Sequence, residues 1–415
     1  MTPTVETKAS WKVAGVSLVI LGVAFGSPWV AVVALKIIAA ETGGARSVPA
    51  FASSLAWFGA GFGGIAMGWL ADRYGVRLTV LVGTMMIAIG LAIASLGQGL
   101  LGQTNALYIG HGVFVGLTGI AGMNAPLYVY VSRWFDRRRG SALALISSGQ
   151  YIAGALWPPI FERAIESFGW RETMLIFGLF QLGIILPLAA IFLKRPPETE
   201  THASAAASDG TPATVLGWPP GVVFVMLLVA GFCCCVPMSM PQAHLVALCS
   251  DLGIVASHGA AMLSLLLGTA FLSRQMWGWI SDRIGGLATV LIGSAWQFCC
   301  IIGFALTQDE AGLFAVSAIF GLGFAGIVPA YVLTARELFP ARQAGWRVPA
   351  LLCCTGLGMA AGGWFAGLLY DHFGYYAPAF AAGLVFNSVN LVLIGTLVAR
   401  RRMWLAGPRA VSVYG

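Results

Sequence analysis

The sequence predicts an all-α membrane protein with twelve transmembrane helices in two six-helix halves. Composition gives the first reason: hydrophobic residues make up 58% of the 415 residues and charged residues only 9%. A soluble domain carries roughly 25% charged residues, so this chain has too few to cover a water-soluble surface. A soluble enzyme, a disordered chain and a nucleic-acid binder are therefore excluded. The net charge of +7 indicates basic loops beside a lipid bilayer.

The second reason is the number of long apolar runs, since a helix needs roughly 20 mostly apolar residues to cross a bilayer. In chain order the predicted spans are 12–39, 50–71, 78–98, 106–132, 141–161, 172–193, 220–247, 258–280, 288–307, 311–335, 348–370 and 375–399. The first run, after Lys8 and Lys12, is too long for a signal-peptide core and is taken as a span. The 54 glycines favour close packing of membrane helices.

A polar stretch interrupts this pattern after the sixth span. Residues 194–219 are rich in Ala and Ser and contain Pro196, Pro197 and Glu198, as is typical of a flexible linker. We therefore divide the chain into an N-terminal six-helix half (1–193), a cytoplasmic linker (194–219) and a C-terminal six-helix half (220–415).

The distribution of Lys and Arg predicts the orientation. With the N-terminus inside, eighteen of the 23 Lys and Arg residues fall on the inner side, three on the outer side and two, Lys36 and Arg274, within spans. The excess of positive charge on one side predicts that both termini are cytoplasmic. We expect a multi-pass protein of a bacterial-type inner (plasma) membrane.

The two halves repeat each other. The sequence GWLADRYG begins at Gly68 after the second span, and GWISDRIG begins at Gly278 after the eighth, 210 positions later. Two parallel six-helix halves joined by a linker match the architecture of the major facilitator superfamily.

The loop from Gly68 to Arg77, GWLADRYGVR, resembles the signature G-x-L-a-D-R-x-G-x-R between helices 2 and 3 of that superfamily. The chain is identified on this basis as a suspected member. Asp72 ends a helix and can pair with Arg133, and breaking this pair would free the cytoplasmic side to open. The alternative is that the loop arginines only hold the loop inside. The residues assigned to gating are Asp72, Arg73, Arg77, Arg133, Asp282 and Arg283.

A narrower resemblance rests on SRQMWGWISDRIG, which places Arg274 inside helix 8, four residues before Gly278. This is similar to the monocarboxylate transporter and oxalate–formate antiporter group, whose members carry an anion-binding Arg at that place. The stretch from Met240 to Ile254 is similar to helix 7 of bacterial members. The resemblance implies a carboxylate substrate held by Arg274.

Charges within a membrane are costly, so each is a candidate for function. Arg274 presents a planar fork that matches a carboxylate, with snorkelling to the interface as the alternative. With the span ending at 280, it lies about 9 Å from the cytoplasmic end. Lys36, near the outer end of helix 1, either attracts the anion or pairs with Glu41 or Asp251. None of the sixteen acids lies deep in a span, which disfavours a transporter of organic cations.

Polar residues on the helices that line the cavity of this fold complete the site. His244 on helix 7 is expected to bind substrate or carry a proton, or else to be a packed histidine bonded to a backbone carbonyl. The residues that can donate hydrogen bonds to a carboxylate, or serve helix packing, are Asn124, Tyr128, Gln150, Tyr151 and Tyr331. Asn124 and Tyr128 are four apart and therefore on one helix face.

We expect a secondary transporter of small organic (mono)carboxylates that works by alternating access and by proton symport. Anion exchange, or ligand sensing without net transport, is the alternative. The eight Cys, mostly in apolar runs, are taken as packing residues, with no metal site, no cofactor and no enzymatic activity. We expect a monomer whose partners are the carboxylate, protons and lipid.

Overall fold

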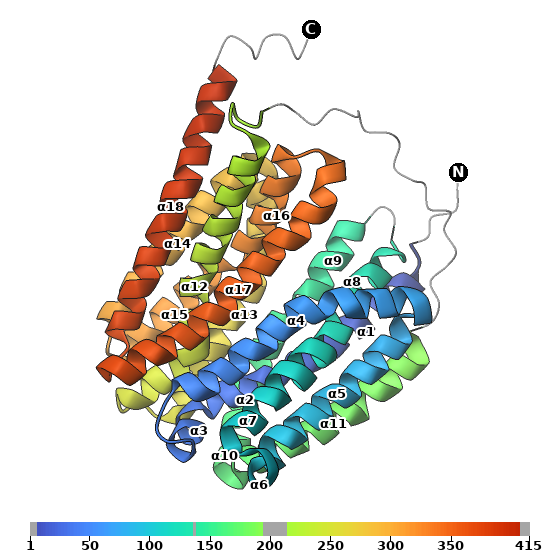
Figure 1. Cartoon of the computed structure of the whole chain (residues 1–415), viewed down its shortest axis with the longest axis vertical. Coiled ribbons are helices and arrows are strands. Elements are labelled where there is room, and N and C mark those ends of the chain that lie inside the picture. The colour runs from blue at the N-terminus through green and yellow to red at the C-terminus, as the bar shows by residue number, and fades with distance from the viewer. Residues whose placement is uncertain (1–5, 136–137, 194–213, 407–415) are drawn as a thin grey trace.

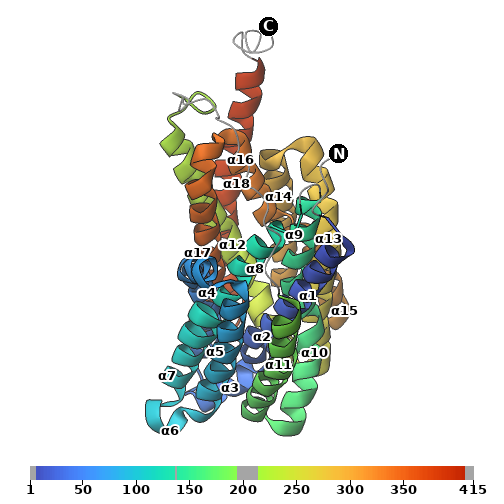
Figure 2. The ribbon, with the colours of Figure 1, turned by 90° about the vertical axis from the view of Figure 1, so that its right-hand side faces the viewer.

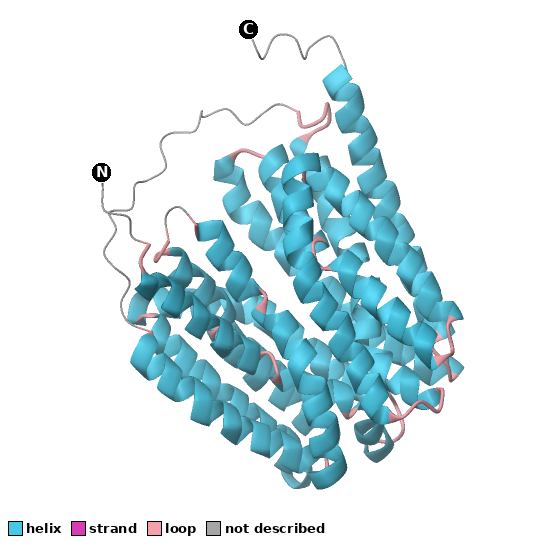
Figure 3. Ribbon diagram, turned by 180° about the vertical axis from the view of Figure 1, so that it is seen from behind, coloured by secondary structure: helices cyan, strands magenta, loops and turns pink. Residues whose placement is uncertain are grey.

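The structure is a computed structural model that describes residues 6–135, 138–193 and 214–406. In these residues the chain is almost entirely helical, with short connections (Figure 3). The first half contains α1 (Lys8–Ala24), α2 (Ser27–Val33), α3 (Leu35–Glu41), α4 (Ser47–Tyr74), α5 (Val76–Leu96), α6 (Gln98–Leu101), α7 (Gln103–Tyr108), η1 (Ile109–Gly119), η2 (Ile120–Gly122), α8 (Asn124–Ser132), α9 (Arg139–Ser147), α10 (Gly149–Phe168) and α11 (Trp170–Phe192). The second contains α12 (Pro220–Asp251), α13 (Ala256–Ile284), α14 (Gly286–Leu306), α15 (Glu310–Phe324), α16 (Ile327–Leu338), α17 (Ala341–Phe373) and α18 (Ala377–Ala406).

The predicted spans agree with these helices. Within the described ranges, 11 helical stretches are long and apolar enough to cross a membrane, and they cover every predicted span except 141–161. That region is also helical, as α9 and α10. It is less apolar than the other spans because Glu162, Arg163 and Glu166 interrupt the sequence of α10. The chain is thus a multi-pass membrane protein.

Some spans are broken where the sequence predicted one continuous helix. The run 12–39 divides into α1, α2 and α3, and 311–335 divides into α15 and α16 at Ala325 and Gly326. The run 106–132 passes through a π-helical segment, η1, and a short 3₁₀ turn, η2. The sequence remains apolar through all these breaks, so hydrophobicity alone could not locate them.

The two halves lie side by side as separate bundles, α1–α11 and α12–α18 (Figure 1). The N-terminal and C-terminal ends lie at the same end of the molecule in both side views (Figures 1 and 2). We call this the termini end, and the opposite end, which carries Arg46 and Asp251, the far end. Of the predicted linker, 194–213 lies outside the described residues, and the remainder contains a turn in which Val215 pairs with Trp218.

The halves meet through α4 against α17 and through α10 against α13. A Cβ on Gly367 of α17 would lie 2.8 Å from the Cα of Ser47 on α4, so only glycine permits this approach. Between α10 and α13, a Cβ on Gly154 would likewise overlap the side chain of Leu267. Small residues thus let helices of opposite halves approach closely, as they do in other membrane proteins.

Candidate functional site

Arg274 lies deeper than the sequence predicted. Its helix, α13, continues to Ile284, so Arg274 lies ten residues, or about 15 Å, from the helix end rather than about 9 Å. The prediction ended the span at 280 because Ser281, Asp282 and Arg283 are polar. The helix continues through them because its backbone hydrogen bonds do not depend on side-chain polarity.

The guanidinium of Arg274 faces the other half of the molecule. Its Nη1 atom lies 3.3 Å from the hydroxyl of Tyr151 on α10, at the limit of a hydrogen bond. Its Cζ atom lies 5.4 Å from the centre of the same ring, within the range of a cation–π contact. Arg274 is half-buried. No carboxylate among the described residues pairs with it, and its positive charge is therefore available to an anion.

One of the predicted binding residues, Tyr128, interacts with this arginine, and two others, Asn124 and Gln150, lie on the same helices as the two tyrosines. Tyr128 on α8 interacts electrostatically with Arg274 and Tyr151, and its hydroxyl bonds to Ser147. Asn124 lies one turn before Tyr128 on the same helix, and Gln150 directly precedes Tyr151. Asn124, Tyr128 and Gln150 are all half-buried. The structure therefore places Arg274 of α13 beside two tyrosines of the first half, Tyr151 of α10 and Tyr128 of α8.

A small cavity of about 30 Å³ lies between the halves. It is lined by Trp29, Val32, Ser53, Ser54, Trp57, Ser239, Gln242, Ala243, Met359 and Gly363. A Cβ at Gly154 would lie 3.0 Å from Trp29, which places that indole where α10 meets α13, one turn from Tyr151. The cavity thus presents hydroxyl, amide and indole groups between the two halves.

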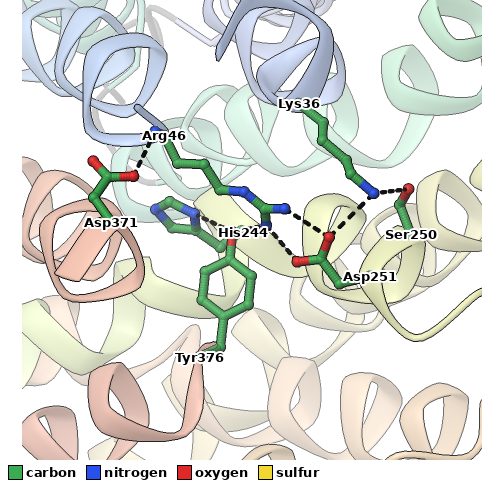
Figure 4. Close-up of polar contacts among 7 residues, drawn as sticks. All are labelled: Lys36, Arg46, His244, Ser250, Asp251, Asp371 and Tyr376. Atoms are coloured by element: carbon green, nitrogen blue, oxygen red, sulfur yellow. Dashed lines mark hydrogen bonds and ion pairs between the residues drawn. The ribbon is translucent and has the colours of Figure 1, made fainter. Parts of the chain in front are cut away.

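At the far end, a buried ion pair joins the two halves (Figure 4). Arg46, which precedes α4 and is 6% exposed, holds both carboxylate oxygens of Asp251 at 2.5 and 2.6 Å. Its Nη1 also donates to the hydroxyl of Tyr376 at 2.8 Å, and its Cζ lies 3.6 Å from the centre of the Tyr370 ring. Burial by itself lowers the pKa of Arg46, but the bonds to Asp251 and Tyr376 outweigh it and raise that pKa above its usual value. The guanidinium therefore stays charged.

Two further contacts cross between the halves at this end. Asp371, from the end of α17, accepts hydrogen bonds from the backbone N–H groups of Arg46 (2.7 Å) and Ser47 (3.0 Å). It therefore caps the N-terminus of α4, where a negative charge is favourable. Lys36 bonds to Asp251 at 3.1 Å and to Ser250 at 2.9 Å. Pairing of Lys36 with Asp251 was one of the two predicted alternatives. The two cations of this cluster, Lys36 and Arg46, come from the first half, and the two acids, Asp251 and Asp371, come from the second.

His244 lies at the far end, on α12, and is 1% exposed. Its Nε2 is 2.7 Å from the carbonyl oxygen of Gly363, and its Nδ1 is 3.0 Å from the Tyr376 hydroxyl. A carbonyl only accepts, so Nε2 carries the proton, and a neutral ring then accepts at Nδ1 from Tyr376. A directed chain of hydrogen bonds results, from Arg46 through Tyr376 and His244 to Gly363 in the cavity wall.

Tyr331 lies inside the second half and not beside Arg274. It is fully buried, and its hydroxyl donates to Asn390 of α18 at 2.5 Å. Asn390 bonds in turn to Asn387, whose side chain donates to the carbonyl of Ser294. This chain joins α14, α16 and α18, which corresponds to the helix-packing role that the sequence left open.

The predicted gating residues lie at the termini end. The contact between Asp72 and Arg133 is confirmed, at 3.0 Å, with side chains 67% and 52% exposed. Arg73 stacks near Trp69 and Tyr74, Arg283 stacks on Trp279, and Arg77 and Asp282 are exposed. Among the described residues at this end, the ion pairs Asp72–Arg133 and Glu337–Arg401 each stay within one half.

The sequence did not single out Arg46, Tyr376 or Asp371 as site residues, whereas Tyr151 was among the polar residues named for the cavity helices. Arg46 was placed in an outer loop and Asp371 among acids outside the membrane. The only available signal was that charged residues stood next to span ends. The pairing between Arg46 and Asp251 joins residues 205 positions apart, and nothing local in the sequence specifies it.

Two membrane-spanning helical bundles packed against each other define the class: this is a multi-pass membrane protein built from two halves. The sequence profile of the Major Facilitator Superfamily matches residues 16–352, and the chain belongs to this superfamily.

Related proteins agree with this assignment. An MFS-type transporter of Aspergillus niger, pynF, is 22% identical over 364 residues, which are 85% of this chain and 81% of that protein. Monocarboxylate transporter 13 of Bos taurus is 24% identical over 323 residues, covering 76% of this chain and 72% of that protein. Among solved structures, a D-xylose-proton symporter superposes with a TM-score of 0.71 at 14% identity, covering 92% of this chain and 96% of that one.

Proposed function

We propose that this transporter moves small organic carboxylates across the membrane by alternating access, and that Arg274 binds the carboxylate. One observation carries the proposal: a half-buried arginine about 15 Å from its helix end faces a tyrosine of the opposite half and has no acid partner among the described residues. The similarity to monocarboxylate transporter 13 supports the same class of substrate.

The energetics favour an anion. A charge in a low-dielectric site is costly unless an opposite charge or several hydrogen bonds compensate it. Arg274 has only the long contact to Tyr151 at 3.3 Å, and a bound carboxylate would supply the missing negative charge in the bidentate geometry that guanidinium prefers. Tyr128 and Tyr151 would donate to the same carboxylate, while Asn124 and Gln150 would contact the rest of the substrate.

The alternating-access step rests on the different contacts at the two ends. Arg46, Asp251, Asp371 and Tyr376 form a cluster between the halves, which we call the far-end gate, and it is closed in this structure. At the termini end the ribbons of the halves diverge (Figure 1), and the ion pairs Asp72–Arg133 and Glu337–Arg401 do not join the halves. On the proposed orientation, in which both termini are cytoplasmic, we infer from these contacts that the structure represents the inward-facing state. The signature loops at Asp72 and Asp282 would close that end in the opposite state.

Proton symport is the proposed coupling, and the hydrogen-bond chain of His244 gives it a physical basis. While Arg46 donates to Tyr376, the oxygen of Tyr376 is engaged and its O–H is directed to Nδ1 of His244. A protonated His244 would need that oxygen as an acceptor, so the closed gate disfavours the proton. When the gate opens and Arg46 withdraws, Tyr376 can accept from a protonated ring. His244 would then take up a proton from the outer side in the outward-open state, and it would release that proton toward the inward-open side after the far end has closed and Arg46 has returned to Tyr376.

Uptake into proteoliposomes tests the proposal. The purified protein, reconstituted with and without an inward pH gradient, should accumulate a radiolabelled monocarboxylate such as lactate or pyruvate only with the gradient. Uptake that requires unlabelled substrate inside would instead indicate anion exchange, and specific binding without either activity would indicate a sensor.

A matched pair of variants connects this uptake to the site. Arg274→Gln removes the proposed binding charge, whereas Arg336→Gln removes an exposed charge at the termini end. Carboxylate uptake should be lost in the first variant and kept in the second. Near-normal uptake by correctly inserted Arg274→Gln protein would reject the site and with it the case for a carboxylate substrate.

A further inference from the structure

A cavity lies on the outside of the second half, between the α13–α14 junction and α18. Its volume is about 490 Å³, within the range of roughly 300–1,000 Å³ that is usual for small-molecule sites. It is lined by Ile284, Leu287, Ala288, Ile292, Val398, Arg401 and Arg402. Five apolar residues from the α13–α14 junction and α18 thus form the floor, and two arginines of α18 stand at its rim.

The charges at the rim are unequal. Arg401 is bonded to Glu337 at 2.9 Å, and Glu337 also accepts from the backbone N–H of Gly286 at 2.9 Å. Arg402 is exposed, and no carboxylate of the described residues pairs with it. Arg400, the next residue back, stacks over Trp218 at 4.5 Å. Three arginines against one glutamate leave this rim with a net positive charge.

Exposed tryptophans place the rim at the membrane surface. Trp404 follows Arg401 and Arg402 by one turn or less, and Trp279 lies five residues before Ile284 of the groove. Both tryptophans are more than half exposed. Tryptophan is enriched at the membrane–water interface. The groove then extends inward, because Ile292 lies four residues past Ala288 on α14, about 6 Å deeper. A headgroup at Arg402 would therefore have acyl chains running along Ile292 and Val398.

The internal repeat shows that the two halves differ at one position of this groove. The position equivalent to Leu287 in the first half, 210 residues earlier, is Arg77, which is exposed. The first half has a charge where the second has an apolar floor. If the loop served only to fix the topology, a positive charge would be expected at position 287, as at Arg77. The second half instead has the apolar Leu287 there, next to the arginines of α18.

We propose that this groove between α14 and α18 binds an anionic glycerophospholipid of the leaflet at the termini end, with its phosphate at Arg402 and Arg401 and its acyl chains on Ile292, Leu287 and Val398. Basic pockets between transmembrane helices are known to hold acidic lipid headgroups. The bound phosphate would compete with Glu337 for Arg401. It would thereby act on the contact that holds the start of α14 to the end of α16.

Native mass spectrometry of the full-length protein in detergent tests the proposal. The probes are dioleoyl phosphatidylglycerol and dioleoyl phosphatidylethanolamine, which share their chains and differ in net charge. Phosphatidylglycerol should bind several-fold more tightly, and this preference should shrink as salt rises. Arg402→Gln should weaken its binding about five-fold, which corresponds to roughly 1 kcal/mol per arginine near a membrane surface. Arg402→Lys should keep most of it.

Two further variants distinguish lipid binding in the groove from nonspecific electrostatic attraction of anionic lipid to the protein. Ala288→Phe should fill the floor and displace the tightest bound lipid without a change of charge. Arg336→Gln, with the same loss of charge at the same end but outside the groove, should have no effect. Equal binding of the two lipids, or equal weakening by Arg336→Gln and Arg402→Gln, would identify ordinary surrounding lipid only and overturn the proposal. Displacement by millimolar inorganic phosphate would also overturn it in favour of a site for free anions.

Discussion

The far-end gate gives the sharpest test of the proposed mechanism, through the substitution Asp251→Asn. Arg46 is 6% exposed, and Asp251 holds it with two short hydrogen bonds. Removing one partner of a buried ion pair costs about 2–5 kcal/mol. The lower value applies here, because Tyr376 and Tyr370 still contact Arg46 and the Asp251 side chain is 22% exposed. A loss of about 2 kcal/mol from the closed gate should raise the ratio of outward-open to inward-open protein roughly 30-fold.

Hydrogen–deuterium exchange followed by mass spectrometry can measure both ends of the molecule at once. In Asp251→Asn, the peptides covering 44–54 and 366–376 at the far end should exchange faster. The peptide covering 68–78 at the termini end should exchange more slowly, because the outward-open state closes that end. General destabilisation would instead accelerate exchange at both ends.

The matched control is Glu41→Gln. Glu41 pairs with Arg171 at 2.6 Å, also at the far end, but both residues belong to the first half. This variant loses a carboxylate without affecting the contact between halves, so its exchange pattern should resemble that of the wild type. The reasoning is refuted if Asp251→Asn leaves the two ends unchanged, or if Glu41→Gln shifts them equally.

Three further predictions concern the substrate site, the termini-end loops and the proton. Calorimetry should show weaker carboxylate binding in Arg274→Lys than in wild type, because lysine lacks the planar fork of arginine. Arg274→Gln, which loses the charge, should bind about 30-fold more weakly or worse. Neutral analogues should bind poorly to all three proteins. Asp72→Asn should slow transport and leave binding and melting temperature nearly unchanged, since exposed ion pairs contribute at most about 1 kcal/mol; Asp282→Asn should have a smaller effect, and equal loss of binding and transport would make Asp72 a structural residue. His244→Gln should keep both hydrogen bonds but remove titration, so gradient-driven uptake should fall while substrate exchange survives; no change in either activity would leave His244 only a packing role.

Much of the fold could be predicted from local sequence. Long apolar runs located the helices because crossing a bilayer requires them, and the repeat at Gly68 and Gly278 indicated two related halves. The predicted ends were short by several residues at Ile284 and Phe373. A helix continues into the headgroup region, where polar side chains are tolerated, and hydrophobicity does not report that continuation.

The candidate site was predicted less completely. Arg274 was recognisable because a charge inside an apolar run has no local explanation. Tyr331 and His244 were predicted as binding residues because each lies on a helix expected to line the cavity. The structure instead buries Tyr331 inside the second half and places His244 in hydrogen bonds at the far end. Which side of a helix a residue occupies depends on the rotation of that helix against its neighbours. A membrane helix that is apolar on all sides carries no pattern to reveal this.

The sequence by itself thus determined the class of protein, the position of the spans and the presence of two charges within them, Lys36 and Arg274, because the bilayer imposes its requirements residue by residue along a helix. Only the tertiary structure decided the partners. Tyr151 meets Arg274 across 123 positions, and Asp251 meets Arg46 across 205. Such contacts arise from the crossing of helices that belong to different halves. They are a property of how the two bundles pack against each other, and no segment of the chain specifies that packing alone.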